Sequence, residues 1–349
     1  MKRRTVLTSG LSVAAAMSLG QSGAAAKADS PAQADCWSSA ALAASHREPA
    51  ATGVGTGGCR MVQLHNGYNV WVKHVAAYNS SIPVLTLHGG PGFPHFYFEC
   101  FEDFLPQAGM TYWYYDQLGC GFSDQPDDTR LWNLARFTSE VEEVRTALGF
   151  ERMVVLGHSW GGMLAIEYAL AHPDRLAGLV ISNMVASIPS YEKYILKLRD
   201  QLPAAKLDRL KELERTRAYD TPEYEDIINY LYHQHICRVD PWPEPVSRAV
   251  KWLALPVYNT VQGKSEFEVT GNMKGWDRWQ DLPKIRTPTL ILGGRYDTMS
   301  PQDLMEMSRR MPAARTVICP NGSHLSMYDD QQSYFSVLLP FLNRVTRRA

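Results

Sequence analysis

The chain has 349 residues, of which 45% are hydrophobic and 20% charged, and its formal net charge is −1. This is the composition of an ordinary folded protein, and the length is sufficient for one large domain or two with a sizeable core. A nearly neutral chain has no broad basic surface, so we expect no nucleic-acid partner.

The first 28 residues have the features of an export signal. Three basic residues at positions 2–4 precede a weakly apolar run at 6–19, and small residues then offer cleavage sites near Ala26 or Ala28. Paired arginines before a weakly hydrophobic core resemble a twin-arginine signal. The run is too short to span a bilayer, which needs about 20 apolar residues. We therefore expect cleavage of residues 1–28, no membrane span in the mature chain, and a periplasmic or secreted protein.

Residues 29–56 are rich in Ala, Ser, Gly and Pro, and we interpret them as a flexible leader into the domain. Six cysteines follow the signal, at positions 36, 59, 100, 120, 237 and 319. Their spacing matches no zinc-binding pattern, and we expect no metal. Export permits disulfides, for example between Cys36 and Cys59, but the sequence leaves the pairing open.

From residue 61 onward, apolar strands alternate with amphipathic helices. Strand-like segments lie at 61–64, 68–75, 83–87, 110–115, 154–156 and 176–182, and helical segments lie at 132–148 and between the fifth strand and His172. This alternation predicts an α/β fold with a mostly parallel sheet and helices on both faces.

The alternation stops between residues 185 and 283. Charged helical stretches with interleaved aromatic residues, such as Lys193–Arg217 and Glu223–His235, occur there instead of strands. Strands return at 287–294 and 315–319, each followed by a helix. We therefore expect a helical cap inserted after the sixth core strand. The expected boundaries are 57–184 for the first part of the core, 185–283 for the cap and 284–349 for the second part of the core.

A Gly-x-Ser-x-Gly sequence at 157–161 follows the fifth strand and precedes a helix. The order of strand, sharp turn and helix is that of a nucleophile elbow, which holds a serine at the carboxyl edge of a sheet, above a helix N-terminus. A plain turn of glycine and serine has the same short pattern. The interpretation of Ser159 as a nucleophile therefore depends on the rest of the chain.

Candidates for the base and the acid follow Ser159 in the chain order that this fold requires. Asp297 comes just after the strand at 287–294, and His324 just after the strand at 315–319. Taken singly, a loop aspartate is usually a turn residue, and a loop histidine is usually solvated. Because open α/β sheets carry their sites at the carboxyl ends of strands, the three residues together predict a catalytic triad.

A serine that attacks a carbonyl also needs two N–H groups for the oxyanion. One is predicted to be the backbone N–H of Trp160, the residue after the nucleophile. The other is expected from the loop His88-Gly89-Gly90-Pro91-Gly92. In that loop glycine lets the backbone approach the substrate, with Gly90 as the donor and Gly89 as a substrate contact. The alternative for a glycine- and proline-rich loop is a plain turn.

Three segments carry a resemblance to a known family. They are Leu87-His88-Gly89-Gly90-Pro91-Gly92, Asp116-Gln117-Leu118-Gly119-Cys120-Gly121-Phe122-Ser123 and Gly157-His158-Ser159-Trp160-Gly161-Gly162. They look like the proline iminopeptidases, serine exopeptidases of the α/β-hydrolase fold that remove N-terminal residues, often proline. The resemblance extends from about residue 60 to residue 345. The cap segments 232–238 and 259–276 are similar to the tricorn-interacting aminopeptidase and to bacterial L-amino acid amidases.

The resemblance also implies a partner for the amine of the substrate. An aminopeptidase binds a free α-ammonium, and a charge that leaves water needs a carboxylate nearby. By similarity this carboxylate is Glu266, in a Glu-Phe pair of the cap, with Tyr258 as the cap tyrosine of the site. A solvated surface glutamate is the alternative reading of Glu266. The relative has a second glutamate directly after the triad aspartate, where this chain has Thr298, so we expect weaker anchoring of the ammonium.

The sequence leaves the roles of several cap residues undecided. The missing carboxylate could be replaced by one of three nearby glutamates, namely Glu223, Glu225 and Glu268. Three tryptophans, Trp252, Trp276 and Trp279, could shape a pocket for proline or another small apolar side chain. They could equally belong to the core of the cap.

We therefore expect an exported serine aminopeptidase or L-amino acid amidase that acts on small peptides or amino-acid amides through an acyl-enzyme, with no cofactor. A carboxylesterase or lactonase with the same triad is the alternative, and Thr298 keeps it open. A protein that only binds its ligand is a third reading, against which the complete triad argues. Dehalogenases and epoxide hydrolases need an aspartate nucleophile, and Ser159 stands in that position.

Overall fold

The computed structural model describes residues 56–76 and 82–347. The predicted export signal, the leader up to residue 55 and Cys36 lie outside the described residues. The five described cysteines form no disulfide with one another. Within these two ranges, no helix is long and apolar enough to cross a membrane.

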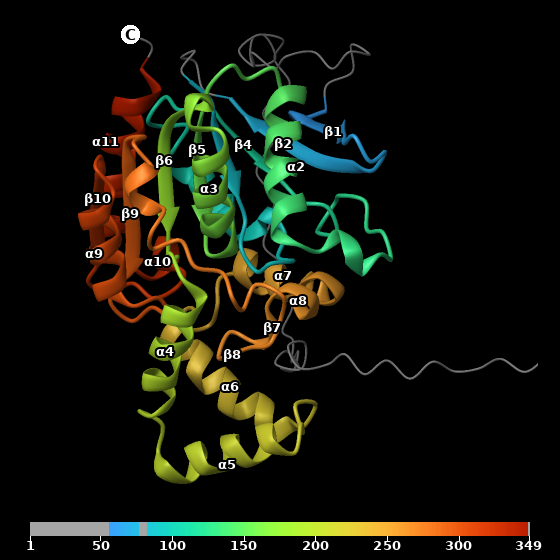
Figure 1. The fold of residues 1–349 in the computed structure, drawn as a ribbon, viewed down its shortest axis with the longest axis vertical. Coiled ribbons are helices and arrows are strands. Elements are labelled where there is room, and N and C mark those ends of the chain that lie inside the picture. Colours follow the sequence, from blue (N-terminus) through green and yellow to red (C-terminus); the bar gives the residue numbers. More distant parts are fainter. Residues whose placement is uncertain (1–55, 77–81, 348–349) are drawn as a thin grey trace, which may run out of the picture.

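A sheet of eight strands forms the centre of the described part of the chain (Figure 1). The strands are β1 (Cys59–Gln63), β2 (Asn69–Val75), β3 (Val84–Leu87), β4 (Tyr112–Tyr115), β5 (Met153–His158), β6 (Leu176–Ser182), β9 (Thr289–Gly294) and β10 (Ala314–Cys319). Their order across the sheet is β1-β2-β4-β3-β5-β6-β9-β10. The pairs β1–β2 and β2–β4 are antiparallel and the other pairs are parallel, which confirms the predicted mostly parallel sheet.

Helices cover both faces of this sheet. One face carries α2 (Leu134–Ala147), α3 (Trp160–Ala171) and α9 (Pro301–Arg310), and the other carries the 3-10 helix η1 (His95–Asp103), α10 (Ser326–Asp329) and α11 (Gln331–Thr346). In β5, Val155 packs into the first core, whereas Val154 and Leu156 pack into the second. Successive side chains of a strand point to opposite faces. A strand buried on both faces therefore needs the uninterrupted apolar run seen in the sequence.

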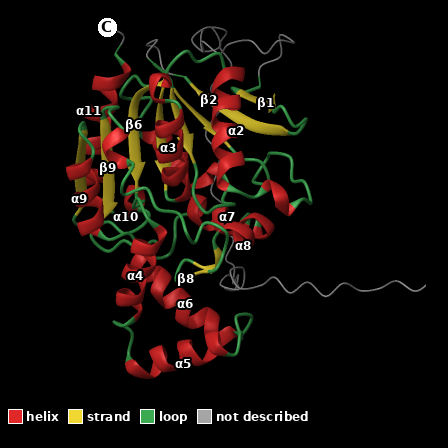
Figure 2. Ribbon diagram, in the orientation of Figure 1, coloured by secondary structure: helices red, strands yellow, loops and turns green. Residues whose placement is uncertain are grey.

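The segment after β6 forms the cap. Its elements are α4 (Ile188–Arg199), α5 (Ala204–Arg215), α6 (Pro222–His235), α7 (Glu244–Lys251), α8 (Leu255–Val261), β7 (Gly263–Ser265) and β8 (Glu268–Val269). Figure 2 shows that the cap is mostly helical and lies beyond the arrowheads of the strands, which mark their carboxyl ends. Hydrogen bonds tie it to the core, from Ala254 N to Gly92 O at 2.9 Å and from Asn272 Nδ2 to the Trp132 carbonyl at 2.7 Å.

Two details of the cap differ from the prediction. The helical stretch expected at Lys193–Arg217 is two helices, because Pro203 has no N–H to continue the first one and instead precedes the start of α5. The cap also contains the short antiparallel pair β7–β8, which the sequence did not indicate. This pair matters for function because Glu266 lies in the turn between its two strands.

Candidate active site

Ser159 lies in the sharp turn between β5 and α3. Its φ is 55° and its ψ is −126°, a strained backbone conformation for a residue with a side chain. Its N–H donates to the Ser182 carbonyl at 2.9 Å, which fixes the turn against the next strand. A Cβ at Gly157 would collide with the backbone of Gly161, and one at Gly161 would collide with the Leu87 carbonyl. The two glycines of the motif are therefore required by close backbone approach, and the turn has the geometry of a nucleophile elbow.

Asp297 and His324 meet at the carboxyl edge of the sheet. Asp297 follows β9, His324 follows β10, and His324 Nδ1 donates to Asp297 Oδ1 at 2.8 Å. Both side chains are buried. Burial alone would lower the pKa of His324, but the carboxylates of Asp297 and Glu266 outweigh it and hold that pKa above its usual value. Because Nδ1 carries the proton shared with Asp297, Nε2 is the nitrogen left to act as a base.

Asp297 is positioned by a hydrogen bond from Asn183, a residue that the sequence analysis did not identify. Asn183 Nδ2 donates to Asp297 Oδ2 at 2.7 Å and to the Ser323 carbonyl at 3.0 Å. Its φ of 53° turns the chain sharply at the end of β6, a conformation that asparagine tolerates better than most residues. The signal available in the sequence was its place directly after a predicted strand. Asn183 therefore orients the carboxylate that orients the imidazole.

Ser159 belongs to the same cluster, but the structure contains no direct hydrogen bond between Ser159 Oγ and His324. The ring of His158, the residue before Ser159, lies 5.0 Å from the ring of His324, centroid to centroid. Catalytic hydrogen bonds in structures without substrate are often long and shorten only in the complex. The arrangement therefore brings all three predicted residues to one site, with the acid–base pair already joined.

The two predicted oxyanion donors are free. Trp160 is the first residue of α3, and among the described residues nothing accepts its backbone N–H or that of Gly90. Gly90 lines the same pocket as Ser159 and has a φ of +114°. A residue with a side chain would be strained there, so glycine is required.

Gly89 differs from Gly90 in this respect. Its N–H donates to Tyr97 OH at 2.6 Å, and its carbonyl accepts from His88 Nδ1 at 3.1 Å. Both polar groups of its backbone are therefore used within the protein. The N–H of Gly89 is therefore not available to a substrate, and the substrate contact at Gly89 stays a prediction.

A buried chain of hydrogen bonds joins the oxyanion loop to the histidine loop. Tyr97 OH accepts from Gly89 N–H and contacts His158 Nδ1 at 3.1 Å, while His158 Nε2 contacts the His324 carbonyl at 2.8 Å. Burial lowers the pKa of His158 to about 3, and the positive charge of His324 acts in the same direction. A neutral His158 that donates from Nε2 must accept the Tyr97 hydroxyl at Nδ1. The chain therefore has one consistent set of donors and fixes the two loops relative to each other.

The segment around Gln117, the second of the three that carry the family resemblance, holds the loop of Gly89 and Gly90 in place. Gln117 N donates to His88 Nε2 at 2.9 Å, and Gln117 Nε2 donates to the His88 carbonyl at 2.8 Å. The indole N–H of Trp160 donates to Gln117 Oε1 at 2.9 Å. Burial lowers the pKa of His88 to about 4, so this histidine is neutral and acts as a structural link. Gln117 thus couples the loop that carries one predicted oxyanion donor, Gly90, to Trp160, the residue predicted to supply the other.

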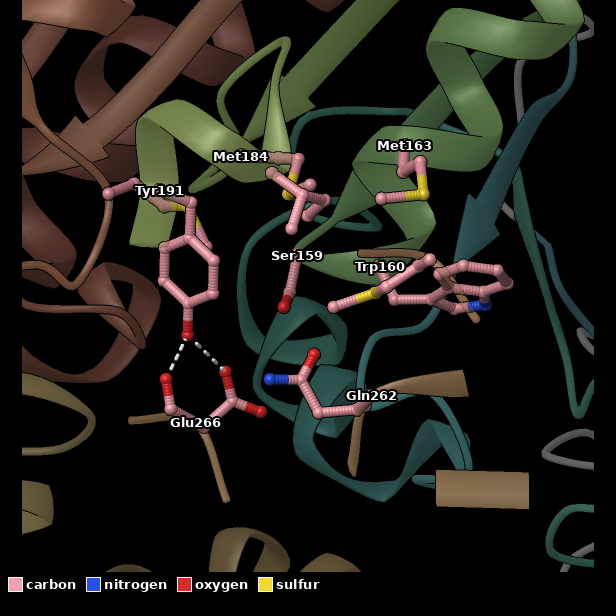
Figure 3. Close-up of a pocket in the computed structure, with 11 residues that line it drawn as sticks. Ser159, Trp160, Met163, Met184, Tyr191, Gln262 and Glu266 are labelled. Carbon is pink, nitrogen blue, oxygen red and sulfur yellow. Dashed lines mark hydrogen bonds between the residues drawn. The ribbon is translucent and has the colours of Figure 1, made fainter. Parts of the chain in front are cut away.

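A pocket in front of Ser159 is apolar on most sides and contains one carboxylate. Its lining residues are Gly90, Ser159, Trp160, Met163, Met184, Ile188, Tyr191, Gln262, Glu266, Met273 and Met299. Figure 3 shows Ser159 between Met184 on one side and Glu266 with Gln262 on the other. Ser159, the predicted nucleophile, therefore faces a pocket with an apolar wall and an acidic end.

Two tyrosine hydroxyls hold the carboxylate of Glu266. Tyr191 OH donates to Oε2 at 3.1 Å and to the Glu266 carbonyl (Figure 3). Tyr258 OH donates to Oε1 at 3.2 Å. Burial raises the pKa of Glu266, while the charge of His324 and the two hydroxyls act in the opposite direction. Tyr258 thus lies behind Glu266 and orients it. Tyr191 comes from α4, and nothing in the sequence singled it out.

Comparison with known proteins agrees with this geometry. The alpha/beta hydrolase fold family matches residues 82–331. The proline iminopeptidase of Flavobacterium johnsoniae is 42% identical over 282 residues, which cover 80% of this chain and 95% of that protein. The chain belongs to the proline iminopeptidase family.

Solved structures of related proteins have the same fold. The crystal structure of the proline iminopeptidase of Mycobacterium smegmatis matches with a TM-score of 0.77 and 32% identity, over 82% of this chain and 98% of that one. The crystal structure of VinJ matches with a TM-score of 0.79 and 30% identity, over 82% and 99% of the two chains. The predicted family and the α/β-hydrolase fold are confirmed, and the chain is an enzyme of the serine aminopeptidase type.

Within this member of the proline iminopeptidase family, Thr298 supports the acid–base pair. It is fully buried, and its hydroxyl lies 3.4 Å from both Asp297 Oδ1 and His324 Nδ1. It is not among the residues that line the pocket. The position after the triad aspartate therefore contributes no charge to the pocket.

None of the three cap glutamates considered as a replacement lines this pocket either. Glu223 forms an ion pair with Arg209 at 2.6 Å on an exposed face, and Glu268 accepts from Tyr219 OH at 3.0 Å. Within the described residues, Glu266 is the carboxylate among the lining residues, and the uncharged amide of Gln262 is also among them. The structure also contains no group of three His, Cys, Asp or Glu side chains arranged for a metal within its described ranges.

The three cap tryptophans lie outside the pocket of Ser159. Trp276 is buried and donates from Nε1 to Glu167 at 2.7 Å, and Trp279 donates to Ser190 Oγ at 3.0 Å. Trp252 is 45% exposed and packs against phenylalanine rings of the core. They have structural roles, and the apolar wall of the pocket is made mainly of methionines.

Proposed function

We propose that this enzyme removes an N-terminal amino acid, proline or another small apolar residue, from peptides and amino-acid amides through an acyl-enzyme. The observation that carries the proposal is the carboxylate of Glu266 in the pocket of the nucleophile. The proline iminopeptidases named above are similar over most of their length, which supports the same reaction here.

In the acylation step, His324 Nε2 takes the proton of Ser159 Oγ as this oxygen bonds to the carbonyl carbon of the substrate. The backbone N–H groups of Gly90 and Trp160 stabilise the negative charge on the carbonyl oxygen. His324 then gives the proton to the leaving amine, and the C–N bond breaks. Asp297 stabilises the imidazolium throughout and keeps its tautomer.

Water completes the reaction. His324 takes a proton from a water molecule as the water oxygen attacks the ester carbon of the acyl-enzyme. The same two N–H groups stabilise the second oxyanion. The bond from the carbonyl carbon to Ser159 Oγ then breaks, the serine recovers its proton from His324, and the amino acid leaves.

Glu266 suits a substrate with a free N-terminus. An ionised carboxylate offers about four lone-pair sites, and the hydroxyls of Tyr191 and Tyr258 take one on each oxygen. The two remaining acceptor sites match in number the two N–H donors of a prolyl secondary ammonium. A charge-assisted contact of this kind is strong when it replaces water.

The walls of the pocket suit a small apolar side chain. Met163, Met184, Met273, Met299 and Ile188 line it. Methionine fills irregular apolar space and adapts to different shapes, which is compatible with proline and with other apolar residues. The same walls would reject a charged side chain because they offer it no partner.

The esterase or lactonase reading is less well supported. An uncharged substrate would cover the carboxylate of Glu266 without providing a cation, and such burial of an ion is costly. The second candidate therefore makes no use of the pocket's acidic end.

We also propose that the enzyme is exported. The basic residues at positions 2–4, the weakly apolar run at 6–19 and the small residues near Ala26 and Ala28 support this proposal. N-terminal sequencing of the protein recovered from the periplasm or medium tests it, with a start near residue 27 or 29 expected and retention of the intact N-terminus in the cytoplasm contradicting it.

Chromogenic substrates test the proposed reaction. The purified wild-type enzyme is assayed with L-prolyl and L-alanyl arylamides and with a simple aryl ester, beside Ser159→Ala. We expect cleavage of both arylamides at a higher kcat/KM than the ester, and loss of all activity in the variant. Turnover of the ester without turnover of either arylamide would favour the esterase instead.

A further inference from the structure

A second hollow lies beside the pocket of Ser159, between the start of α2 and the cap segment 272–278. Its lining residues are Asn133, Leu134, Asn272, Met273, Gly275, Trp276, Asp277 and Arg278. Its volume is about 410 Å³, within the range of about 300–1,000 Å³ that is usual for ligand pockets. Asn272, Gly275 and Asp277 are exposed, so the hollow opens to solvent.

Met273 connects the hollow to the active site. It lines both the hollow and the pocket of Ser159, and it is only 7% exposed. Its backbone N–H donates to the Val261 carbonyl at 3.2 Å, which fixes the main chain, whereas its side chain is flexible. A substrate that reaches the nucleophile is therefore one methionine side chain away from the hollow.

The lining of the hollow is more polar than that of the pocket. Asn272 Nδ2 is used by the Trp132 carbonyl at 2.7 Å, whereas nothing in the described chain donates to Asn272 Oδ1. The guanidinium of Arg278 is held by Glu167, with Nε to Oε1 at 2.6 Å. The hollow therefore offers a free amide acceptor and no uncompensated cation, which fits the N–H groups of a neutral peptide backbone.

We propose that this hollow binds the peptide chain that follows the scissile bond. This inference rests on the proposed function, since it needs an N-terminal residue held by Glu266 with its carbonyl at Ser159. Every residue after the first must then leave the pocket, and the hollow is open, polar and adjacent through Met273. The enzyme is accordingly a peptidase that gains affinity from residues beyond the bond it cuts.

Gly275 allows a test that leaves the core of the protein untouched. A Cβ built on Gly275 has no heavy atom within 4 Å, and its φ lies outside the left-handed region. Gly275→Trp therefore adds a bulky side chain to the lining of the hollow without a clash at Cβ, and Gly275→Ala is the matched control that adds only a methyl group. Prolinamide, whose leaving group is ammonia, is compared with prolyl-triglycine on both variants and on the wild type.

We expect Gly275→Trp to raise KM for prolyl-triglycine by about tenfold and to change kcat/KM for prolinamide by less than about twofold, as expected when only binding of the leaving group is lost. Gly275→Ala should behave as the wild type with both substrates. An equal loss on both substrates, or no loss on either, would overturn the inference.

A length series on the wild-type enzyme gives a second test without any substitution. KM is measured for prolyl-glycine, prolyl-diglycine and prolyl-triglycine, and it should fall as residues are added until the hollow is filled. A KM that does not change with length would also overturn the inference. If the wild type cleaves neither prolinamide nor any of these peptides, the proposed function itself fails, and that outcome is distinct from the others.

Discussion

Replacing Glu266 by glutamine removes the charge at the acidic end of the pocket and keeps the shape of the side chain. Tyr191 and Tyr258 both donate to the carboxylate, so one hydroxyl must rotate when an amide replaces it. Hydrogen bonds to charged groups contribute about 1.5–3 kcal/mol each. A net loss of about 3 kcal/mol in transition-state binding corresponds to a fall of about 150-fold in kcat/KM.

The assay compares L-prolyl arylamide with an aryl ester that has no amine. In Glu266→Gln, kcat/KM should fall by about 150-fold on the arylamide. It should not fall on the ester, because the ester never pairs with the carboxylate and no longer has to cover an ion. Glu268→Gln is the matched control, because Glu268 lies nearby in the cap, accepts from Tyr219 and does not line the pocket. Equal losses on the two substrates, or an arylamide kcat/KM within about threefold of the wild type, would refute the role given to Glu266.

Three further predictions concern the support of the triad. Asn183→Gly keeps a backbone with positive φ and removes the amide that holds Asp297, so kcat should fall by about 10–100-fold at unchanged KM, and a KM effect alone would contradict this. Tyr97→Phe leaves the Gly89 N–H and His158 Nδ1 without their shared partner and should lower kcat by about tenfold or more. Tyr112→Phe, at another buried tyrosine, is its control, and it should leave kcat unchanged. Catalysis needs neutral His324, whose pKa lies above its usual value, so kcat/KM should rise as pH increases through that pKa. Glu266→Gln removes a negative charge that raises this pKa, so its acidic limb should move to lower pH, and a shift to higher pH would be the wrong sign.

The sequence predicted the strands and the order of the triad because these depend on local patterns. Val154, Val155 and Leu156 are apolar because β5 is buried on both faces. Asp297 and His324 could be predicted as triad members because they follow strands whose carboxyl ends share one edge. Each of these inferences needs only a short window of sequence and the rules of a parallel sheet.

The residues that the sequence missed act across long distances in the chain. Asn183 reaches Asp297 over 114 positions, and Tyr191 reaches Glu266 over 75. The sequence alone cannot distinguish the roles of Gly89 and Gly90. Only the position of the Tyr97 hydroxyl shows that the N–H of Gly89 is hydrogen-bonded within the protein and that of Gly90 is free. The division of Lys193–Arg217 into two helices was signalled by Pro203, whose effect on a helix is known. The strands β7 and β8 are too short to show the alternating hydrophobic pattern by which a strand is predicted from sequence.

N-acetylation of the substrate separates the role of the ammonium from the chemistry of the cleaved bond, because it removes the positive charge and leaves the scissile bond in place. The measurement is the ratio of kcat/KM for L-prolyl arylamide to that for its N-acetylated form with the wild-type enzyme. We predict a ratio of at least about 100, since the acetylated amine cannot pair with Glu266 and an acetyl group must occupy the acidic end of the pocket. Equal kcat/KM values for the free and acetylated substrates would contradict it.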